Sequence, residues 1–106
     1  MPKYLIQASY TAEGAKGLLK DGGSKRRQAA EQVMKSVGGK LEAFYFALGD
    51  TDAFVIVEAP DQAAIAAASL VINASGAINT KTIALLTPEE IDQAAKKSVN
   101  YRAPGQ

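Results

Sequence analysis

"LEAFYFALGDTDAFVIVE", residues 41–58, is the stretch that decides the fold. Two runs rich in aromatic and β-branched residues, 41–48 and 53–58, flank the turn sequence "GDTD" at 49–52. Aromatic and β-branched side chains favour strands, whereas Gly and Asp favour tight turns. The stretch therefore predicts a β-hairpin in the middle of the chain.

The sequence before the hairpin predicts one strand and two helices. Residues 3–10 are rich in strand-forming residues and predict a strand. Thr11 can cap a helix that Gly22 and Gly23 should end. Ser24 can cap a second helix, which residues 38–39 should terminate. The apolar face of this second helix is formed by Ala29, Ala30, Val33, Met34 and Val37.

The sequence after the hairpin predicts a helix, a strand and a last helix. An alanine-rich helix begins at residues 60–61, runs to about Val71 and is ended by "NASG" at 73–76. Residues 78–86 predict the fourth strand. "TPEE" at 87–90 then begins a helix with an N-cap threonine, a first-turn proline and a glutamate at the third helical position, the pattern of a capping box.

This order of elements is typical of the ferredoxin-like fold, an α+β class. It predicts a βαββαβ antiparallel sheet with helices on one face, plus a C-terminal helix. The chain has 106 residues, the size of one domain. We expect a single domain over residues 1–98 and an extended tail over residues 99–106.

Both faces of the predicted hairpin carry apolar side chains. Leu41 and Tyr45 share one face of the first strand, and Phe44 and Phe46 share the other. A sheet covered by helices on one side normally has a polar second face, so we expect a cover for this one. We favour a second copy packing sheet to sheet, which makes the protein a homo-oligomer. The alternative is a monomer in which the C-terminal helix covers the face.

Composition excludes several kinds of site. The chain has no cysteine and no histidine, which rules out disulfides, Cys/His zinc sites, His-based triads and histidine haem ligands. A metal site built from Asp and Glu oxygens stays open, although no cofactor or metal is expected. The net charge of +1 argues against nucleic acid or an anionic membrane as the main partner. Without a signal peptide or a membrane-spanning run, the expected location is cytoplasmic.

Strand directions bring four segments to one end of the sheet: residues 9–10, 22–27, 49–52 and 73–76. They carry hydroxyl groups, cations, carboxylates and an amide, so a ligand site is expected there. The candidate ligand-binding residues are Ser24, Lys25, Arg26, Arg27, Asp50, Asp52, Asn73 and Ser75.

The cations at 25–27 raise a question of charge, because the helix dipole disfavours positive charge in a first turn. The favoured explanation is that Asp50 or Asp52 pairs with Arg26 or Arg27 and fixes the hairpin to the helix. Arg27 can also pair with a glutamate four residues on. The alternative is an anion held by free backbone N–H groups and guanidinium groups. The stretch lacks the spacing of a phosphate-binding P-loop.

The chain resembles the GYD domain family in the stretches "KYLIQASYTAEG", "GGSKRR", "GGKLEAFYFALGDTD" and "INASGAINTKTIALLTPEE". The resemblance covers nearly the whole chain and implies a ferredoxin-like fold akin to dimeric α/β-barrel proteins. It implies no established activity and no catalytic residue. Gly49 and Asp52 match the Gly and Asp of the family name, and Thr51 stands where a tyrosine is expected.

Three functions fit the sequence. The first is a homo-oligomeric domain that binds a small anionic or carbonyl metabolite. The second is a cofactor-free oxygenase or isomerase of the dimeric α/β-barrel kind, with a pocket between helices and sheet. Its acid/base, orienting and oxyanion-stabilising residues would be Tyr45, Asp52 and Arg26. The third is a purely structural subunit. Packing explains Tyr45 more simply than catalysis does, and the missing histidine counts against an enzyme.

Overall fold

The structure is a computed structural model that describes all 106 residues. Strands and helices follow the predicted order, including the additional helix at the C-terminus. The elements are β1 (Lys3–Tyr10), α1 (Ala12–Asp21), α2 (Gly23–Ser36), β2 (Lys40–Phe46), β3 (Ala53–Glu58), α3 (Gln62–Ala74), β4 (Ile78–Leu85) and α4 (Pro88–Ala95).

The four strands form one open antiparallel sheet in the order β2-β3-β1-β4. β1 lies at the centre, where Leu5 pairs with Ile56 of β3 and with Ile83 of β4. This order is compatible with a ferredoxin-like fold, and the α+β class is confirmed.

The predicted hairpin is confirmed, with a shorter first strand than expected. β2 ends at Phe46, and a β-bulge between Leu41 and Ala43 shifts its register against β3. The Ala47 N–H donates to the Asp52 carbonyl at 2.7 Å, which closes the connecting loop. β3 spans the predicted residues.

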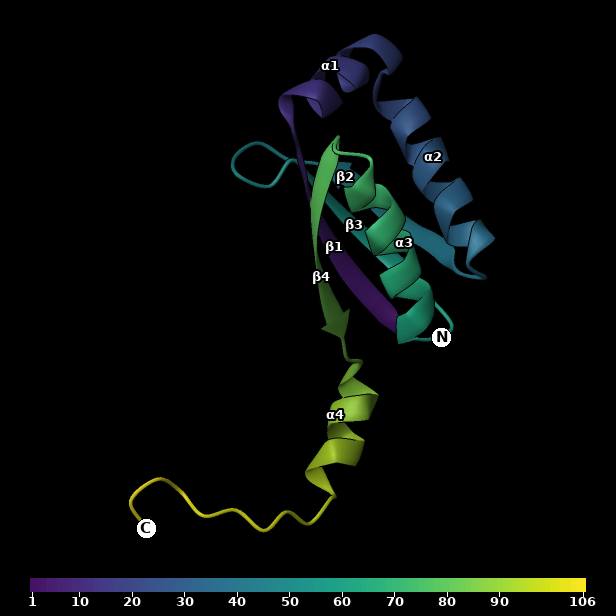
Figure 1. The fold of residues 1–106 in the computed structure, drawn as a ribbon. Coiled ribbons are helices and arrows are strands. Elements are labelled where there is room, and N and C mark those ends of the chain that lie inside the picture. Colours follow the sequence, from purple (N-terminus) through teal and green to yellow (C-terminus); the bar gives the residue numbers. More distant parts are fainter.

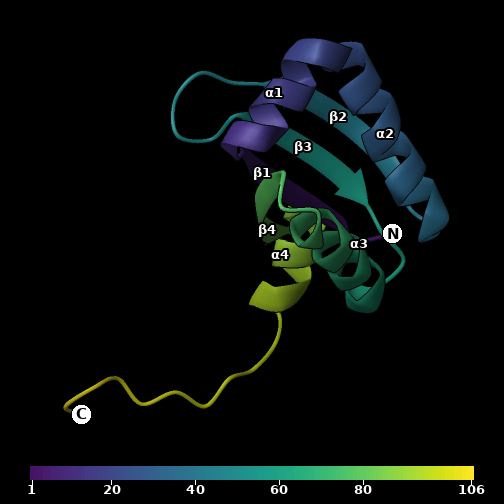
Figure 2. The ribbon, with the colours of Figure 1, turned by 45° about the horizontal axis from the view of Figure 1, so that its top comes forward.

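Helices α2 and α3 lie on one side of the sheet, and α1 lies across its upper end (Figures 1 and 2). The hydrophobic core is the layer between these helices and the sheet. Alternate residues of β1 and β3 point into this layer and are buried. Its main cluster is Tyr4, Ile6, Met34, Val55, Val57, Ala59 and Ile65.

The turn from α1 into α2 corrects one sequence prediction. Gly22, not Ser24, is the N-cap of α2, and no side chain caps this helix. Gly22 has a φ of 83°, which a residue with a Cβ rarely adopts. A single glycine thus reverses the chain between the two helices, and Ser24 lies inside the first turn of α2.

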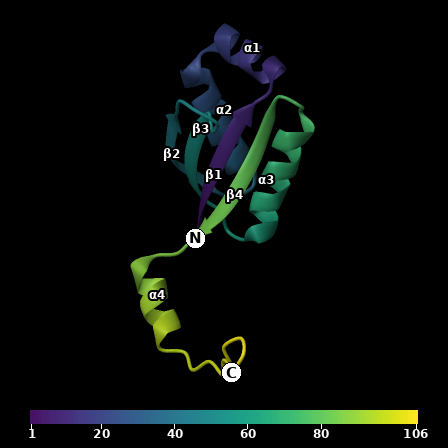
Figure 3. The same ribbon diagram turned by 90° about the vertical axis from the view of Figure 1, so that its left-hand side faces the viewer.

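The C-terminal helix does not cover the second face of the sheet. α4 has the predicted capping box at Thr87 and Glu90, yet it projects beyond the end of β4 (Figures 1 and 3). The Cα radius of gyration is 16.9 Å, compared with about 13 Å for a compact chain of this length. The alternative prediction, that this helix covers the second face of the sheet, is therefore wrong. None of the helices combines the length and the apolar character that spanning a membrane requires.

The second face of the sheet is therefore uncovered (Figure 3). We call it the open face. The register places on it Leu5, Tyr45, Phe54, Ile56, Ile83 and Leu85. Tyr45 is 72% exposed, and Phe54 and Ile83 are 38% and 39% exposed. An apolar surface of this kind usually marks an interface.

Candidate functional site

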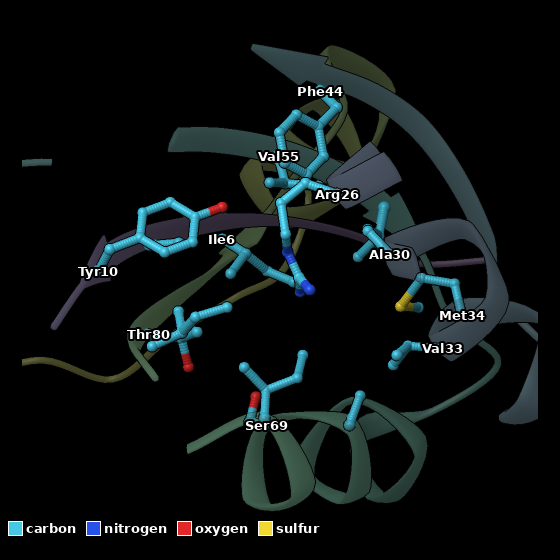
Figure 4. A pocket seen from close by; sticks show the side chains of 15 residues that line it. Ile6, Tyr10, Arg26, Ala30, Val33, Met34, Phe44, Val55, Ser69 and Thr80 are labelled. Carbon is cyan, nitrogen blue, oxygen red and sulfur yellow. The ribbon is translucent and has the colours of Figure 1, made fainter. Parts of the chain in front are cut away.

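A cavity of about 60 Å³ lies between the helices and the inner face of the sheet. Twelve of its 15 lining residues are hydrophobic. Several of them are small, including Ala8, Ala30 and Ala68, so the two layers meet without filling the space. The other three lining residues, Arg26, Ser69 and Thr80, are polar, and Tyr10, one of the twelve, adds a hydroxyl group (Figure 4).

Arg26 enters the cavity because of its position on α2. It stands four residues before Ala30 and seven before Val33, so the three share one stripe of the helix. That stripe faces the sheet. Figure 4 shows the Arg26 side chain reaching into the cavity, with Tyr10 and Thr80 on one side and Ser69 below.

Arg26 forms no ion pair with a carboxylate of the chain. The ion pairs in the structure are Lys3 with Glu42, and Arg27 with Glu31 at 4.0 Å. The predicted pairing of Asp50 or Asp52 with an arginine of α2 is therefore wrong. Arg27 uses the local partner four residues away, and the Arg26 charge remains available in an apolar cavity.

Asp52 instead binds the end of β1. Its Oδ2 accepts a hydrogen bond from the Tyr10 N–H at 2.8 Å, and its own N–H donates to the Ala8 carbonyl at 2.9 Å. Asp50 contributes only its carbonyl, which accepts from the Ser9 hydroxyl at 3.0 Å. These contacts anchor the hairpin loop to the strand that carries Tyr10.

Tyr10 contributes a phenol that stays protonated near neutral pH. Burial raises the pKa of its hydroxyl above the ordinary value, and the nearby Arg26 charge opposes that rise. The ring stacks on Phe46 with 6.5 Å between ring centroids. In Figure 4 the hydroxyl points toward Arg26. The cavity therefore has a cation and a neutral hydroxyl at the same end.

The two candidates near the end of α3 have structural contacts. Asn73 donates to the Ser69 carbonyl and to the Thr80 hydroxyl, each at 2.7 Å, and accepts from the Thr80 N–H at 3.0 Å. Ser75 donates to the Ile72 carbonyl at 2.7 Å. Asn73 thus lies outside the cavity and positions one of its polar lining residues, Thr80.

The other candidate residues lie elsewhere. Ser24 and Lys25 are exposed on the first turn of α2, and Arg27 lies beside the β2 edge. Tyr45 lies on the open face, on the opposite side of the sheet from the cavity. The structure therefore does not bring Tyr45, Asp52 and Arg26 together as a catalytic set.

The predicted convergence of segments at one end of the sheet is confirmed for β1, the hairpin loop and the α3–β4 turn. Ser9 and Tyr10 bond to the loop, and the Thr11 hydroxyl donates to the Gly76 carbonyl at 2.9 Å. The sequence prediction missed Ser69 and Thr80. Thr80 pairs with Ala8 on the inner face, so a correct register for β4 would have pointed to it. No three acidic side chains gather into a possible metal site.

Comparison with known proteins gives two matches. The family model described as "GYD domain" matches residues 4–95. A protein of Thermus thermophilus named "Glutamine synthetase and cystathionine beta-lyase binding protein" is 29% identical over 83 residues, which are 78% of this chain and 86% of that relative. No solved structure matches the chain at a significant level.

Proposed function

The chain belongs to the GYD domain family, and we propose that it is a self-associating binding domain whose cavity holds a small carboxylate against Arg26. The observation that carries this proposal is an arginine that enters an apolar cavity and has no acidic partner in the chain. A charge in such surroundings is stabilised by a counter-ion and by hydrogen bonds.

The polar side chains of the cavity indicate which chemical group of the ligand contacts Arg26. A guanidinium group offers a planar fork of donors that matches a carboxylate. The Tyr10, Ser69 and Thr80 hydroxyl groups can each donate one further hydrogen bond. A single carboxylate at the polar end of the cavity would neutralise the positive charge of Arg26.

The apolar lining and the volume of the cavity indicate the polarity and the size of the rest of the ligand. Val33, Met34, Val57 and Ile72 also line the cavity and offer no hydrogen bond from their side chains. A water molecule needs roughly 10–15 Å³ of such volume, so 60 Å³ takes roughly four to six atoms of ligand. Short aliphatic monocarboxylates such as butyrate have this size and this polarity.

A thermal-shift comparison of butyrate with uncharged butyramide, at constant ionic strength, tests the site. Saturation to 100 times the dissociation constant stabilises a protein by about 2.7 kcal/mol. We expect butyrate, and not butyramide, to raise the melting temperature of the wild-type protein. Arg26→Met should abolish the rise, because it removes the charge and keeps a long apolar side chain.

Arg27→Met is the matched control, since it removes the neighbouring charge outside the cavity. An equal effect of butyrate on the wild-type protein and Arg26→Met would contradict the proposed site. An equal rise in melting temperature with butyrate and with butyramide would contradict it as well.

Self-association is supported by the open face. An exposed apolar face of a sheet is stabilised when a second copy covers it. We expect light scattering at tens of micromolar protein to give at least twice the 11.1 kDa mass of one chain. Tyr45→Lys should return the protein to monomers, because Tyr45 is 72% exposed and contributes little to the fold of one chain. A wild-type monomer would contradict self-association.

Binding of a partner enzyme is the second candidate function. The exposed apolar surface favours it, and the Thermus relative is named for binding glutamine synthetase and cystathionine beta-lyase. Under this alternative, the wild-type protein captures one of these two enzymes and Tyr45→Lys does not. Failure of both enzymes to bind at micromolar concentration would reject it.

A further inference from the structure

The C-terminal arm, residues 86–101, is the least buried part of the chain. Every residue from 86 to 101 is exposed, and all buried residues of the protein lie between Tyr4 and Ile78. The arm nevertheless carries four large apolar side chains, each at least half exposed: Leu86, Ile91, Val99 and Tyr101. The arm therefore exposes apolar surface that its own chain leaves uncovered.

The helix of the arm is too short to be stable by itself. α4 has eight residues, and isolated helices shorter than about 12–15 residues are marginal in water. Its capping box satisfies two backbone N–H groups at the N-terminus. A lasting helix in this segment needs a packing surface for Ile91 and the alanines that follow it.

The direction of the arm indicates where that surface is. β4 ends at Leu85, and α4 continues past the end of the sheet, away from its own open face and helices (Figure 1). The chain after α4 then runs toward the side of the sheet that carries the open face (Figures 1 and 3). A second copy seated on the open face would lie in its path.

Charges on the arm and on the open face are complementary. Glu89 and Asp92 of α4 form no ion pair, and neither does Lys81 of β4. Lys81 pairs with Gln7 in the sheet, so its side chain lies on the open face beside Ile83. Two other lysines share that face: Lys3 is already bound to Glu42, and Lys40 lies on β2, at the opposite edge of the sheet from β4.

We propose that the arm of one copy packs on the open face of a second copy, along β4, with its acidic side toward Lys81 and Ile91 toward Ile83. In a dimer with two-fold symmetry this contact occurs twice, so each arm packs on the open face of the other copy. This proposal rests on the self-association proposed above, and it names the segment that holds the two copies together.

The chain has no cysteine, so single engineered cysteines report contacts without background. Asp92→Cys in a tagged chain is mixed with Lys81→Cys in an untagged chain and oxidised. A disulfide requires Cα atoms within about 7 Å, and the tag separates the mixed product from the two like products. We expect the mixed disulfide to form at least tenfold faster than the product of Asp92→Cys with Leu19→Cys, which lies on α1. Equal rates would overturn the proposal.

A second measurement uses the dissociation constant of the dimer. Ile91→Lys should weaken self-association at least tenfold, because it removes a buried apolar side chain from each contact. Leu19→Lys is the control, since Leu19 is 87% exposed on another helix. A dimer that is unchanged by Ile91→Lys and broken by Tyr45→Lys would reject the arm contact and leave self-association intact. A monomeric wild-type protein would reject both.

Discussion

The Oδ2 atom of Asp52 accepts a hydrogen bond from the backbone N–H of Tyr10 at 2.8 Å. This bond uses the carboxylate that was expected to neutralise an arginine of α2. It fixes the hairpin loop to the end of β1 and so helps to hold the Tyr10 ring at the cavity. The charge of Arg26 is left for another partner.

Asp52→Ala is expected to lower the free energy of unfolding by about 1.5–3 kcal/mol, the range for a hydrogen bond to a charged group. Chemical denaturation measures this change. Asp50→Ala is the matched control in the same loop, because only the backbone carbonyl of Asp50 makes a hydrogen bond. We expect the control to stay within about 0.5 kcal/mol of the wild-type protein. Equal losses in both variants would contradict the role given to Asp52.

Stability at alkaline pH should depend on Tyr10. Burial raises the pKa of its hydroxyl above the ordinary 10.0, so the folded state holds the proton more tightly than the unfolded state. The resulting stabilisation is present below pH 10 and is lost as pH rises through the raised pKa. Tyr10→Phe removes this titration.

Denaturation from about pH 8 upward should therefore show a smaller loss of stability for Tyr10→Phe than for the wild-type protein. The hydrogen bond to Glu42 raises the pKa of Lys3 as well, but Lys3 titrates in both proteins and cancels in the comparison. Parallel pH profiles would show that the Tyr10 hydroxyl is not held in the buried position.

Gly14 allows α1 to pack on the turn between α3 and β4. A Cβ atom at Gly14 would lie 2.0 Å from the Ala77 carbonyl oxygen, which is backbone and cannot easily move. Gly14→Ala should lower the free energy of unfolding by about 1–3 kcal/mol through overpacking. Gly17→Ala, in the same helix and facing open space, should raise it by about 0.5–1 kcal/mol. Two changes of the same sign would contradict this packing.

Asn73 is expected to act through Thr80, which it positions. Asn73→Ala removes the two hydrogen bonds that fix Thr80 at the cavity and one bond to the Ser69 backbone carbonyl, so we expect a loss of about 1 kcal/mol in stability. The dissociation constant for butyrate should also rise. Asn79→Ala, whose side chain lies exposed on the same strand as Thr80, should change neither quantity. Unchanged butyrate binding in Asn73→Ala would show that the Thr80 hydroxyl group is not part of the site.

Local patterns predicted the elements well. Residues 53–58 formed the expected strand, and Thr87 formed the expected capping box. The failures depended on geometry that one segment does not contain. Ser24 is a good capping residue by type, but the positive φ of Gly22 begins the helix two residues earlier. The direction of α4 follows from the path of the chain after β4, which composition does not determine.

The residues of the candidate cavity were predicted in part. Arg26 was singled out because three cations occupy one helix turn, yet its expected partner was an aspartate. Its place in the stripe of Ala30 and Val33 is visible in the sequence and indicates that it faces the sheet. The cavity itself was not predictable, since it depends on how far small side chains let two layers approach. Tyr45 was misleading because an exposed aromatic residue and a site residue look alike in sequence.

The most direct test of the central claim is an NMR titration of the labelled wild-type protein with butyrate. If the ligand enters the cavity, the shifts will concentrate on the Arg26 side-chain Nε–H and on the methyl groups of Val33, Met34 and Ile72. These residues line the cavity, and the shifts should saturate with a single dissociation constant. Shifts confined to the exposed cations Lys25 and Arg27, or no saturation at all, would contradict a carboxylate site at Arg26.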